Sequence, residues 1–524
     1  MSPTPSWTDP GLGSTPISPA APRRGLLQVL VWLIAGLALL PLVGLVVYSL
    51  LGSGADERLL GAAGRHQLGN TLLLVLGVGT TGAVLGTANG WLAACCTFPG
   101  RRWLRIAQLL PLATPAYLLA ATLIELASRF SWRVYGGWWA MTVLTLSTYS
   151  YVFLLSTESF SCTGRRHLEA CLSLRVGPWA SFGRVALPMA LPAIAAGVAL
   201  SGMEVVNELG AVQLLGVPTL STGILERWQN EGDPRGAVVL ALMALIIVTL
   251  LVAAERIQRR RSRRWSLVGD MQCISPWNLR GWRALAAQFL TLTPPLLSFG
   301  LPLIWACLSW DQLQRESVAE LAALGLRSFS LAFVAALLTV AMGLFLALAR
   351  RWLPQQFLHR LTFVAGMGYA VPGTVLALGL MVIGGPMGLS PLLLLVWGYG
   401  DRFLAVAKQG LDAAFERIPP SLDEAATGLG CGWFKVLGRI HLPLLREPLV
   451  VGSLLIFVDV AKELPLTFAL RPFDFDTLAV RVYQYASDER VGASLLPALL
   501  IMALGLGAAL ALVPSLEKNI GSVK

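Results

Sequence analysis

The chain carries one motif twice, as EACLSLRVGPWASFGRVALP at residues 169–188 and as EAATGLGCGWFKVLGRIHLP at residues 424–443. Each copy begins with an acidic residue and Ala, ends in Leu-Pro and lies between two long apolar runs. The positions that carry the motif are Glu169, Ala170, Gly177, Leu187 and Pro188 in the first copy, and Glu424, Ala425, Ala426, Gly430, Gly432, Ile440, Leu442 and Pro443 in the second.

Composition assigns the chain to the membrane. It is 55% hydrophobic and 13% charged, whereas soluble domains average about 25% charged residues. The apolar runs are long enough to cross a bilayer as helices, and the alternation of a membrane β-barrel is not seen. We therefore predict an all-α polytopic membrane protein with about 12 transmembrane helices. The expected spans are 25–51, 69–95, 104–127, 137–157, 188–214, 236–254, 285–309, 328–349, 361–384, 388–408, 444–470 and 492–514.

The basic residues predict the orientation. The net charge is +11, and the Lys/Arg excess falls on the segments that are inside if both termini are cytoplasmic. The basic excess is therefore topological, and no nucleic-acid binding is expected. The densest basic run, RIQRRRSRRW at 256–265, is either an orientation signal or a site for anionic membrane lipid.

The two motif copies align two halves of the chain. Gly86 and Pro115 correspond to Gly343 and Pro372, each 257 residues on. An even number of spans per half gives two parallel six-helix repeats. The expected domains are a disordered cytoplasmic N-terminus (1–24), a first transmembrane half (25–254, motif loop 158–187), a basic linker (255–284), a second transmembrane half (285–515, motif loop 411–443) and a cytoplasmic tail (516–524).

Each motif loop predicts two short helices with an elbow between them. In the first copy the helical start is stopped at Gly177-Pro178, and Leu187-Pro188 opens the next span. An exposed helix with a small-residue face can lie in a groove of a partner protein. The alternative is a loop that packs only on its own bundle. Two matched copies favour docking to a two-fold symmetric partner.

At these positions the sequence resembles the EAA loop of type I ABC importer permeases. The second copy fits the pattern in full. The first copy departs from it at Cys171, Arg175 and Val185, and Arg175 suggests that the first loop docks more weakly. The resemblance implies the type I ABC importer permease fold in a bacterial inner membrane, with two copies of an ABC ATPase subunit bound at the loops.

A narrower resemblance concerns the cargo. The segments VVNELGAVQLLGVPTLSTGILERW (205–228) and DVAKELPLTFALRPFDFDTLAVRVYQYASDER (459–490) look like fused permeases of ferric-iron importers. That resemblance implies ferric-iron import and a periplasmic or lipid-anchored iron-binding protein as a further partner. Related permeases carry thiamine, aminoalkylphosphonates, polyamines or sulfate, so these cargoes remain alternatives.

The chain is not expected to be an enzyme. No Gly-Lys dipeptide occurs, so there is no phosphate loop, and ATP and Mg would be used by the partner ATPase. The four His form no ligand pair, so neither a cofactor nor a resident metal is predicted. An ion-gradient secondary transporter with two six-helix halves is the alternative from another class, and the matched loops argue against it.

Charges within the apolar segments are the candidates for a pathway. Glu204 and Glu208 are four residues apart and are expected on one helix face, and Asp459 and Glu463 repeat this spacing in the second half. Such charges are costly and usually face a cavity or a partner. The pathway candidates are Glu204, Glu208, Asp459, Lys462 and Glu463. The alternative is a structural gate near the outer membrane face. Asp401 and Arg402 are expected to pair with each other.

Overall fold

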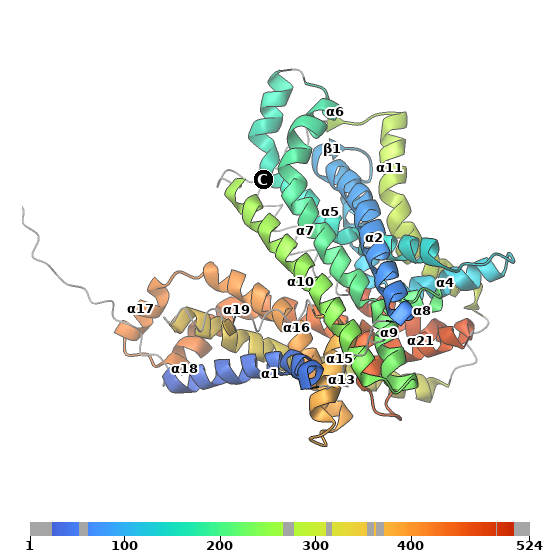
Figure 1. The fold of residues 1–524 in the computed structure, drawn as a ribbon. Coiled ribbons are helices and arrows are strands. Elements are labelled where there is room, and N and C mark those ends of the chain that lie inside the picture. The colour runs from blue at the N-terminus through green and yellow to red at the C-terminus, as the bar shows by residue number, and fades with distance from the viewer. Residues whose placement is uncertain are drawn as a thin grey trace, which may run out of the picture.

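A computed structural model describes residues 24–51, 61–174, 176–265, 277–310, 317–353, 361–362, 371–488 and 490–507. It is helical almost throughout (Figure 1). The elements up to the linker are α1 (Arg24–Leu51), α2 (Gly61–Cys95), β1 (Cys96–Thr97), α3 (Arg101–Ala107), η1 (Leu110–Ala113), α4 (Ala116–Ser128), α5 (Gly137–Ser173), α6 (Pro178–Ser181), η2 (Phe182–Ala186), α7 (Leu187–Asn207), α8 (Gly210–Leu214), α9 (Leu220–Leu225), η3 (Glu226–Asn230) and α10 (Pro234–Trp265).

The second half repeats this order. Its elements are β2 (Trp277–Asn278), α11 (Trp282–Pro295), η4 (Leu296–Gly300), α12 (Leu301–Leu308), α13 (Val318–Trp352), α15 (Gly373–Gly384), α16 (Pro391–Glu416), α17 (Ser421–Gly428), α18 (Trp433–Val436), η7 (Leu437–His441), α19 (Leu442–Lys462), α20 (Pro465–Leu470), α21 (Leu478–Ser487), η8 (Val491–Ser494) and a helix at Leu495–Gly507.

The repeat is visible in helix lengths. Helices α2 and α13 each have 35 residues and start 257 residues apart, and α7 and α19 each have 21 residues and start 255 residues apart. One difference stands out. Helix α5 runs unbroken for 37 residues, whereas its counterpart is split into α16 and α17 by a turn containing Pro419-Pro420. Proline lacks a backbone N–H and does not continue a helix, which explains the break.

Seven helices in the described part of the chain are long and apolar enough to cross a membrane. The number rises to eight if the bent pair Arg101–Ala113 and Ala116–Ser128, with 92° between its arms, counts as one span. The chain is thus a multi-pass membrane protein. The count of twelve spans stays a prediction, as do the domain boundaries and the orientation.

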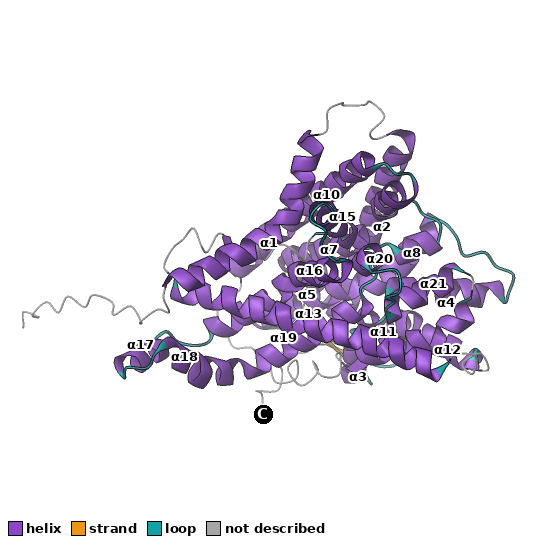
Figure 2. Cartoon of the chain, turned by 90° about the horizontal axis from the view of Figure 1, so that it is seen from below, coloured by secondary structure: helices purple, strands orange, loops and turns teal. Residues whose placement is uncertain are grey.

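The first helix of each half packs against the other half. Helix α1 lies along α15 and α13 (Figures 1 and 2). In addition, the indole nitrogen of Trp397, in α16, donates to the carbonyl of Leu37 at 3.1 Å. Helix α11 lies along α2 and α3, where the amide of Gln108 donates to the Thr291 carbonyl at 2.5 Å. The halves therefore exchange their leading helices and share one apolar core, which includes Ile224 and Ile456.

The predicted linker is partly ordered. Its first residues, 255–265, continue α10. Farther on, Trp277 and Asn278 pair in parallel with Cys96 and Thr97, at the end of α2. Residues 266–276 lie outside the described part of the chain. The end of the linker is thus fixed to the first half.

Glycines at the helix crossings give a testable result. A Cβ atom on Gly86 would lie 2.9 Å from the Phe153 nitrogen, and one on Gly343 would lie 2.7 Å from the Cβ of Ala407. We expect Gly86→Ala and Gly343→Ala each to destabilise the protein by about 1–3 kcal/mol, because overpacking forces helices apart. Thermal unfolding in detergent measures this. Gly452→Ala, where no atom lies within 4 Å, is the matched control and should not lower the unfolding temperature.

Candidate functional site: two motif elements and a cavity between the halves

The second motif forms a helical hairpin at the far end of the second half (Figure 2). Helix α17 ends near Gly430, whose φ of +74° lies in the left-handed region that favours glycine. After Gly432 come α18, the π-helical turn η7 and α19, with Pro443 in the first turn of α19. This order matches the predicted pair of short helices with an elbow.

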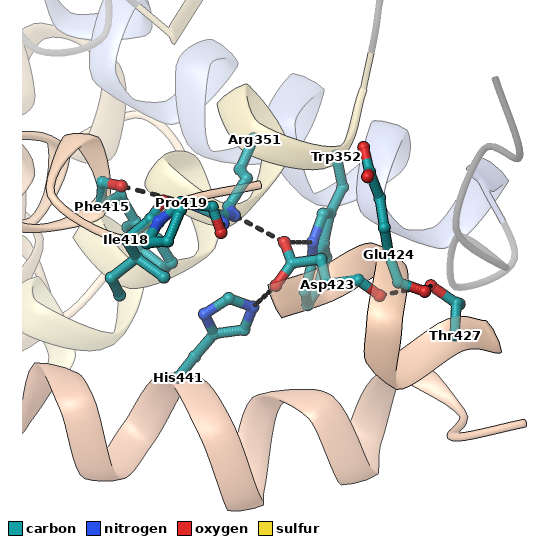
Figure 3. Close-up of polar contacts among 9 residues, drawn as sticks. All are labelled: Arg351, Trp352, Phe415, Ile418, Pro419, Asp423, Glu424, Thr427 and His441. Carbon is teal, nitrogen blue, oxygen red and sulfur yellow. Dashed lines mark hydrogen bonds and ion pairs between the residues drawn. The ribbon is translucent and has the colours of Figure 1, made fainter. Parts of the chain in front are cut away.

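Asp423 connects this hairpin to the end of α13 through hydrogen bonds (Figure 3). Its Oδ2 accepts from Arg351 Nε at 2.6 Å and from the indole Nε1 of Trp352 at 3.4 Å. Its Oδ1 lies 3.1 Å from Nε2 of His441, an ion pair whenever the imidazole is protonated. His441 is fully buried between the rings of Trp352 and Phe415. The carboxylate therefore joins α13, α17 and the start of α19.

Arg351 also closes the turn that separates α16 from α17. Its Nη1 donates to the carbonyls of Phe415 at 3.1 Å and Ile418 at 3.0 Å, and its Nη2 donates to that of Pro419 at 3.3 Å (Figure 3). A helix C-terminus has unpaired carbonyls and partial negative charge, which a guanidinium satisfies. One arginine thus stabilises both the helix end and Asp423.

The pKa of Asp423 is lowered. Burial by itself raises the pKa of this carboxyl, but the close contacts and charges of His441 and Arg351 outweigh burial and hold the pKa below its ordinary value. The stabilisation from this carboxylate is therefore present above the unfolded-state pKa of about 4 and is lost as the pH falls through the lower folded-state pKa.

Replacing Asp423 should loosen the hairpin. We expect Asp423→Ala to reduce the local stability of α17 by about 3–5 kcal/mol, because the largely buried guanidinium of Arg351 loses its carboxylate partner and keeps only carbonyl contacts. Amide hydrogen exchange over residues 421–428 should then be more than about 100-fold faster, and its dependence on acid pH should flatten. Glu424→Gln is the matched control on the neighbouring exposed carboxylate. Unchanged exchange in Asp423→Ala would show that the contacts do not hold the hairpin.

Glu424 points away from this network (Figure 3). The residue is exposed, as is Ala425, whereas Ala426 is buried on the opposite face. Nearby Leu429 and Phe434 are 84% and 71% exposed. The hairpin thus presents an acidic and apolar surface that its own bundle does not cover. This leaves the Glu424 face free for a partner.

The first motif is built differently. Glu169 and Ala170 lie in α5, which carries the element as an extension of a membrane helix, and their side chains fall outside the described set, as does the whole of Arg175. Gly177 precedes α6, and Trp179 is 83% exposed. Leu168 and Ala186 stand at the positions of Asp423 and His441. The contact between Asp423 and His441 therefore has no counterpart at these two positions.

Aromatic packing holds the first element instead. The ring of Trp91 lies 5.4 Å from that of Phe160, 5.1 Å from that of Phe182 and 5.2 Å from that of Trp277. Trp277 comes from the ordered end of the linker, so the linker contributes to this support. The two motif elements consequently match in backbone from α6 and α18 onward, but they differ in the helix before and in the chemistry that fixes them.

A cavity lies between the halves, at the ends of α7 and α19 that are farthest from the motifs. It is lined from the first half by Pro111, Leu112, Thr114, Pro115, Ala116, Tyr117, Leu144, Ser147, Thr148, Tyr151, Glu204, Asn207 and Glu208, and from the second half by Lys462, Glu463, Leu464 and Pro465. Four of the five pathway candidates line this cavity. The fifth, Asp459, is 2.9 Å from Lys462.

The predicted helix face is wrong in both halves. Helix α7 ends at Asn207 and α19 ends at Lys462, so Glu208 and Glu463 lie in extended backbone beyond the helix. Each carboxylate instead accepts from the start of the next short helix: Glu208 from the Ala211 nitrogen at 2.9 Å, and Glu463 from the Leu466 nitrogen at 3.3 Å. Four-residue spacing predicted a helix face on the assumption that each helix continues, although Pro465, three residues beyond Lys462, is a helix-stop signal in the second half.

The expected Asp401–Arg402 pair is also wrong. Arg402 lies 3.5 Å from Glu463 and donates to Asn207 Oδ1 at 3.1 Å, while Oδ1 of Asp401 has no hydrogen-bond partner among the described residues. Asn207 accepts a second bond, from the Gly373 nitrogen at 2.7 Å. The two Asn207 contacts cross between the halves, whereas the Arg402–Glu463 contact lies within the second half. Sequence reasoning missed Arg402 here because adjacent residues on a helix point in different directions.

The cavity is acidic. Glu204 and Glu208 are half-buried, and among the described residues neither forms an ion pair. Tyr117 is 3% exposed, and its hydroxyl has no hydrogen-bond partner in the described part of the chain. The described residues contain no group of three or more His, Cys, Asp or Glu that could hold a metal ion. Three carboxylates and one ammonium thus line the cavity.

Comparison with known proteins adds two findings. The family described as "Binding-protein-dependent transport system inner membrane component" matches residues 86–266 and again residues 339–516, once in each half. The Fe(3+)-transport system permease protein FbpB 2 of Haemophilus influenzae is 26% identical over 450 residues, which cover 83% of this chain and 87% of that protein.

Other relatives match a shorter stretch. The sulfate transport system permease protein CysT of Escherichia coli is 28% identical over 214 residues, covering 37% of this chain and 76% of the relative. The molybdenum transport system permease protein ModB of Escherichia coli is 26% identical over 201 residues, covering 34% of this chain and 88% of the relative. The iron relative is therefore similar across both halves, and these two relatives align with about one half.

Proposed function

Because this chain belongs to the family of binding-protein-dependent transport system inner membrane components, in which it is an ABC importer permease, we propose that its cargo is ferric iron. The observation that carries the proposal is the similarity to the Fe(3+) permease over 83% of the chain, through both halves. The family implies an ATPase and a substrate-binding protein as partners, and its members are transport subunits rather than enzymes.

The charges that line the cavity favour a cation over an oxyanion as the cargo. Glu204, Glu208 and Glu463 line it against a single basic residue, Lys462. Carboxylate oxygens are hard ligands that attract a hard cation and repel sulfate or molybdate. Sulfate and molybdate are therefore the second candidates, favoured only by the half-length relatives. Thiamine, phosphonates and polyamines remain alternatives. Thiamine and polyamines are also cations, so the acidic lining does not separate them from iron, and the similarity to the Fe(3+) permease is what favours iron.

We further propose that the two motif elements transmit ATPase movement. Two ATPase subunits would contact one element each, using ATP and Mg that this chain does not bind. The exposed face around Glu424 supports this role. The contacts of Asp423 with Arg351 and His441 would transmit a displacement of α17 to α13 and α19. The halves would then rock about the shared core and change the side to which the cavity opens. Both termini are taken as cytoplasmic.

Accumulation of radioactive iron in cells tests the cargo. We expect cells that lack this chain to take up iron more slowly under iron limitation, and the restored chain to reverse this. Sulfate and molybdate uptake, measured in the same cells, should not change. Normal iron uptake with a deficit in either oxyanion would reject ferric iron in favour of that cargo.

A further inference from the structure

Two residues at equivalent positions, Asn207 and Lys462, cross between the halves. Each is the last residue of a 21-residue helix, and the two positions are 255 residues apart. Asn207 accepts from the Gly373 nitrogen of the second half at 2.7 Å. Lys462 donates to the Leu112 carbonyl of the first half at 3.1 Å. The interface between the halves, called the seam below, thus includes a contact from each of these equivalent positions. The neutral Asn207 amide accepts, from Gly373 and also from Arg402, whereas the charged Lys462 ammonium donates.

The charge on Lys462 is not needed to close the seam. At the equivalent position a side chain without a charge of its own, Asn207, crosses between the halves as an acceptor. A neutral amide at 462 can donate to a carbonyl equally well. Holding an ammonium within a membrane protein is costly, and such a group is usually matched to a partner or a transport step. The positive charge therefore calls for a second explanation.

The surroundings of Lys462 supply one. Its Nζ lies 2.9 Å from Asp459 Oδ1 and lines the same cavity as Glu204 and Glu208, which have no ion-pair partner among the described residues. The hydroxyl of Tyr117, buried and without a hydrogen-bond partner in the described set, belongs to this lining. The cavity thus combines unpaired carboxylates, the Tyr117 hydroxyl oxygen and the ammonium of Lys462. Carboxylate and hydroxyl oxygens are suitable ligands for a hard cation.

We propose that Lys462 is a tethered cation, which neutralises the acidic cavity between transport cycles and is displaced by a multivalent cation as it enters. This rests on the proposed function in that the cargo is taken to be a cation. Displacement from Asp459 also withdraws the ammonium from the Leu112 carbonyl. Cargo entry therefore loosens the Lys462 contact between the halves, while the Asn207 contacts remain.

Binding of Tb³⁺ tests this on the full chain in complex with its ATPase. Tb³⁺ is a hard trivalent cation whose luminescence is sensitised by nearby tyrosine, and Tyr117 and Tyr151 line the cavity. We expect Lys462→Gln and Lys462→Met to bind Tb³⁺ at least about tenfold more tightly than the unmodified chain, since a competing charge a few ångströms away is removed. Lys462→Arg should bind as the unmodified chain does.

The matched control is Lys408→Met. Lys408 is also buried and paired, with Asp412 at 2.6 Å, but it does not line the cavity, so its loss should leave Tb³⁺ affinity unchanged. Equal Tb³⁺ affinity in the unmodified chain and Lys462→Gln would overturn the proposal. So would failure of Lys462→Gln to assemble with the ATPase, because the charge would then be what holds the halves together.

The result of the Tb³⁺ experiment can be distinguished from the result of the iron-uptake test of the cargo. A tenfold effect at Lys462 without iron uptake would reject ferric iron and keep the tethered cation. Normal iron uptake without any effect at Lys462 would reject the tethered cation and keep the cargo.

Discussion

Exchanging Glu424 for Arg is expected to reduce ATP-dependent uptake at least about thirtyfold, because central charged contacts of an interface commonly contribute 2 kcal/mol or more. The residue is exposed and makes no contact with the Asp423 network, so the fold should be kept (Figure 3). Co-purification of the ATPase, uptake and thermal unfolding measure the three effects separately.

The comparison variant is Glu169→Arg at the first motif. We expect a smaller loss, because the first motif already carries Arg175 and departs from the pattern that the second copy keeps. Its support by aromatic packing on Trp91 is also independent of the charge. Equal and negligible effects of both variants on ATPase association would reject the docking role of the motifs.

Neutralising the unpaired carboxylates of the cavity should have the second large effect. The double variant Glu204→Gln/Glu208→Gln is expected to lower iron uptake at least about tenfold, since each removed charge weakens attraction to a cation by several kcal/mol at short range. ATPase association should not change, because both residues lie at the end of α7 that is farthest from the motif.

Glu125→Gln is the control for this pair. Glu125 is a carboxylate in α4 that forms an ion pair with Arg129 at 3.9 Å and does not line the cavity. Its replacement should leave uptake near the unmodified level. Unimpaired iron uptake by the Glu204/Glu208 double variant would reject the cavity as the pathway, whatever the cargo.

Local sequence patterns predicted the features that depend on local chemistry. The paired motifs, the helical class and the half-to-half correspondence follow from apolar runs and from glycine and proline at fixed offsets. The short helices with an elbow in the second motif follow from Gly430 and Gly432. The Asp459–Lys462 ion pair, present at 2.9 Å, is of the same local kind, because residues three apart on one helix are neighbours.

Features that depend on tertiary packing could not be predicted in this way. The sequence does not mark the end of α7 at Asn207, so Glu208 was assigned to a helix face that it does not occupy. Arg402 pairs with Glu463 across about sixty positions because two helices meet there. The neighbouring acids Asp423 and Glu424 look alike in sequence, and only packing makes one a buried attachment and the other a free surface.

The most direct test of the account is iron uptake by proteoliposomes that contain this chain, its ATPase and its binding protein. The account predicts accumulation of radioactive ferric iron that requires ATP, continues without an ion gradient and is not reduced by excess sulfate or molybdate. Uptake that proceeds without ATP on an ion gradient alone, or that carries an oxyanion in place of iron, would contradict it.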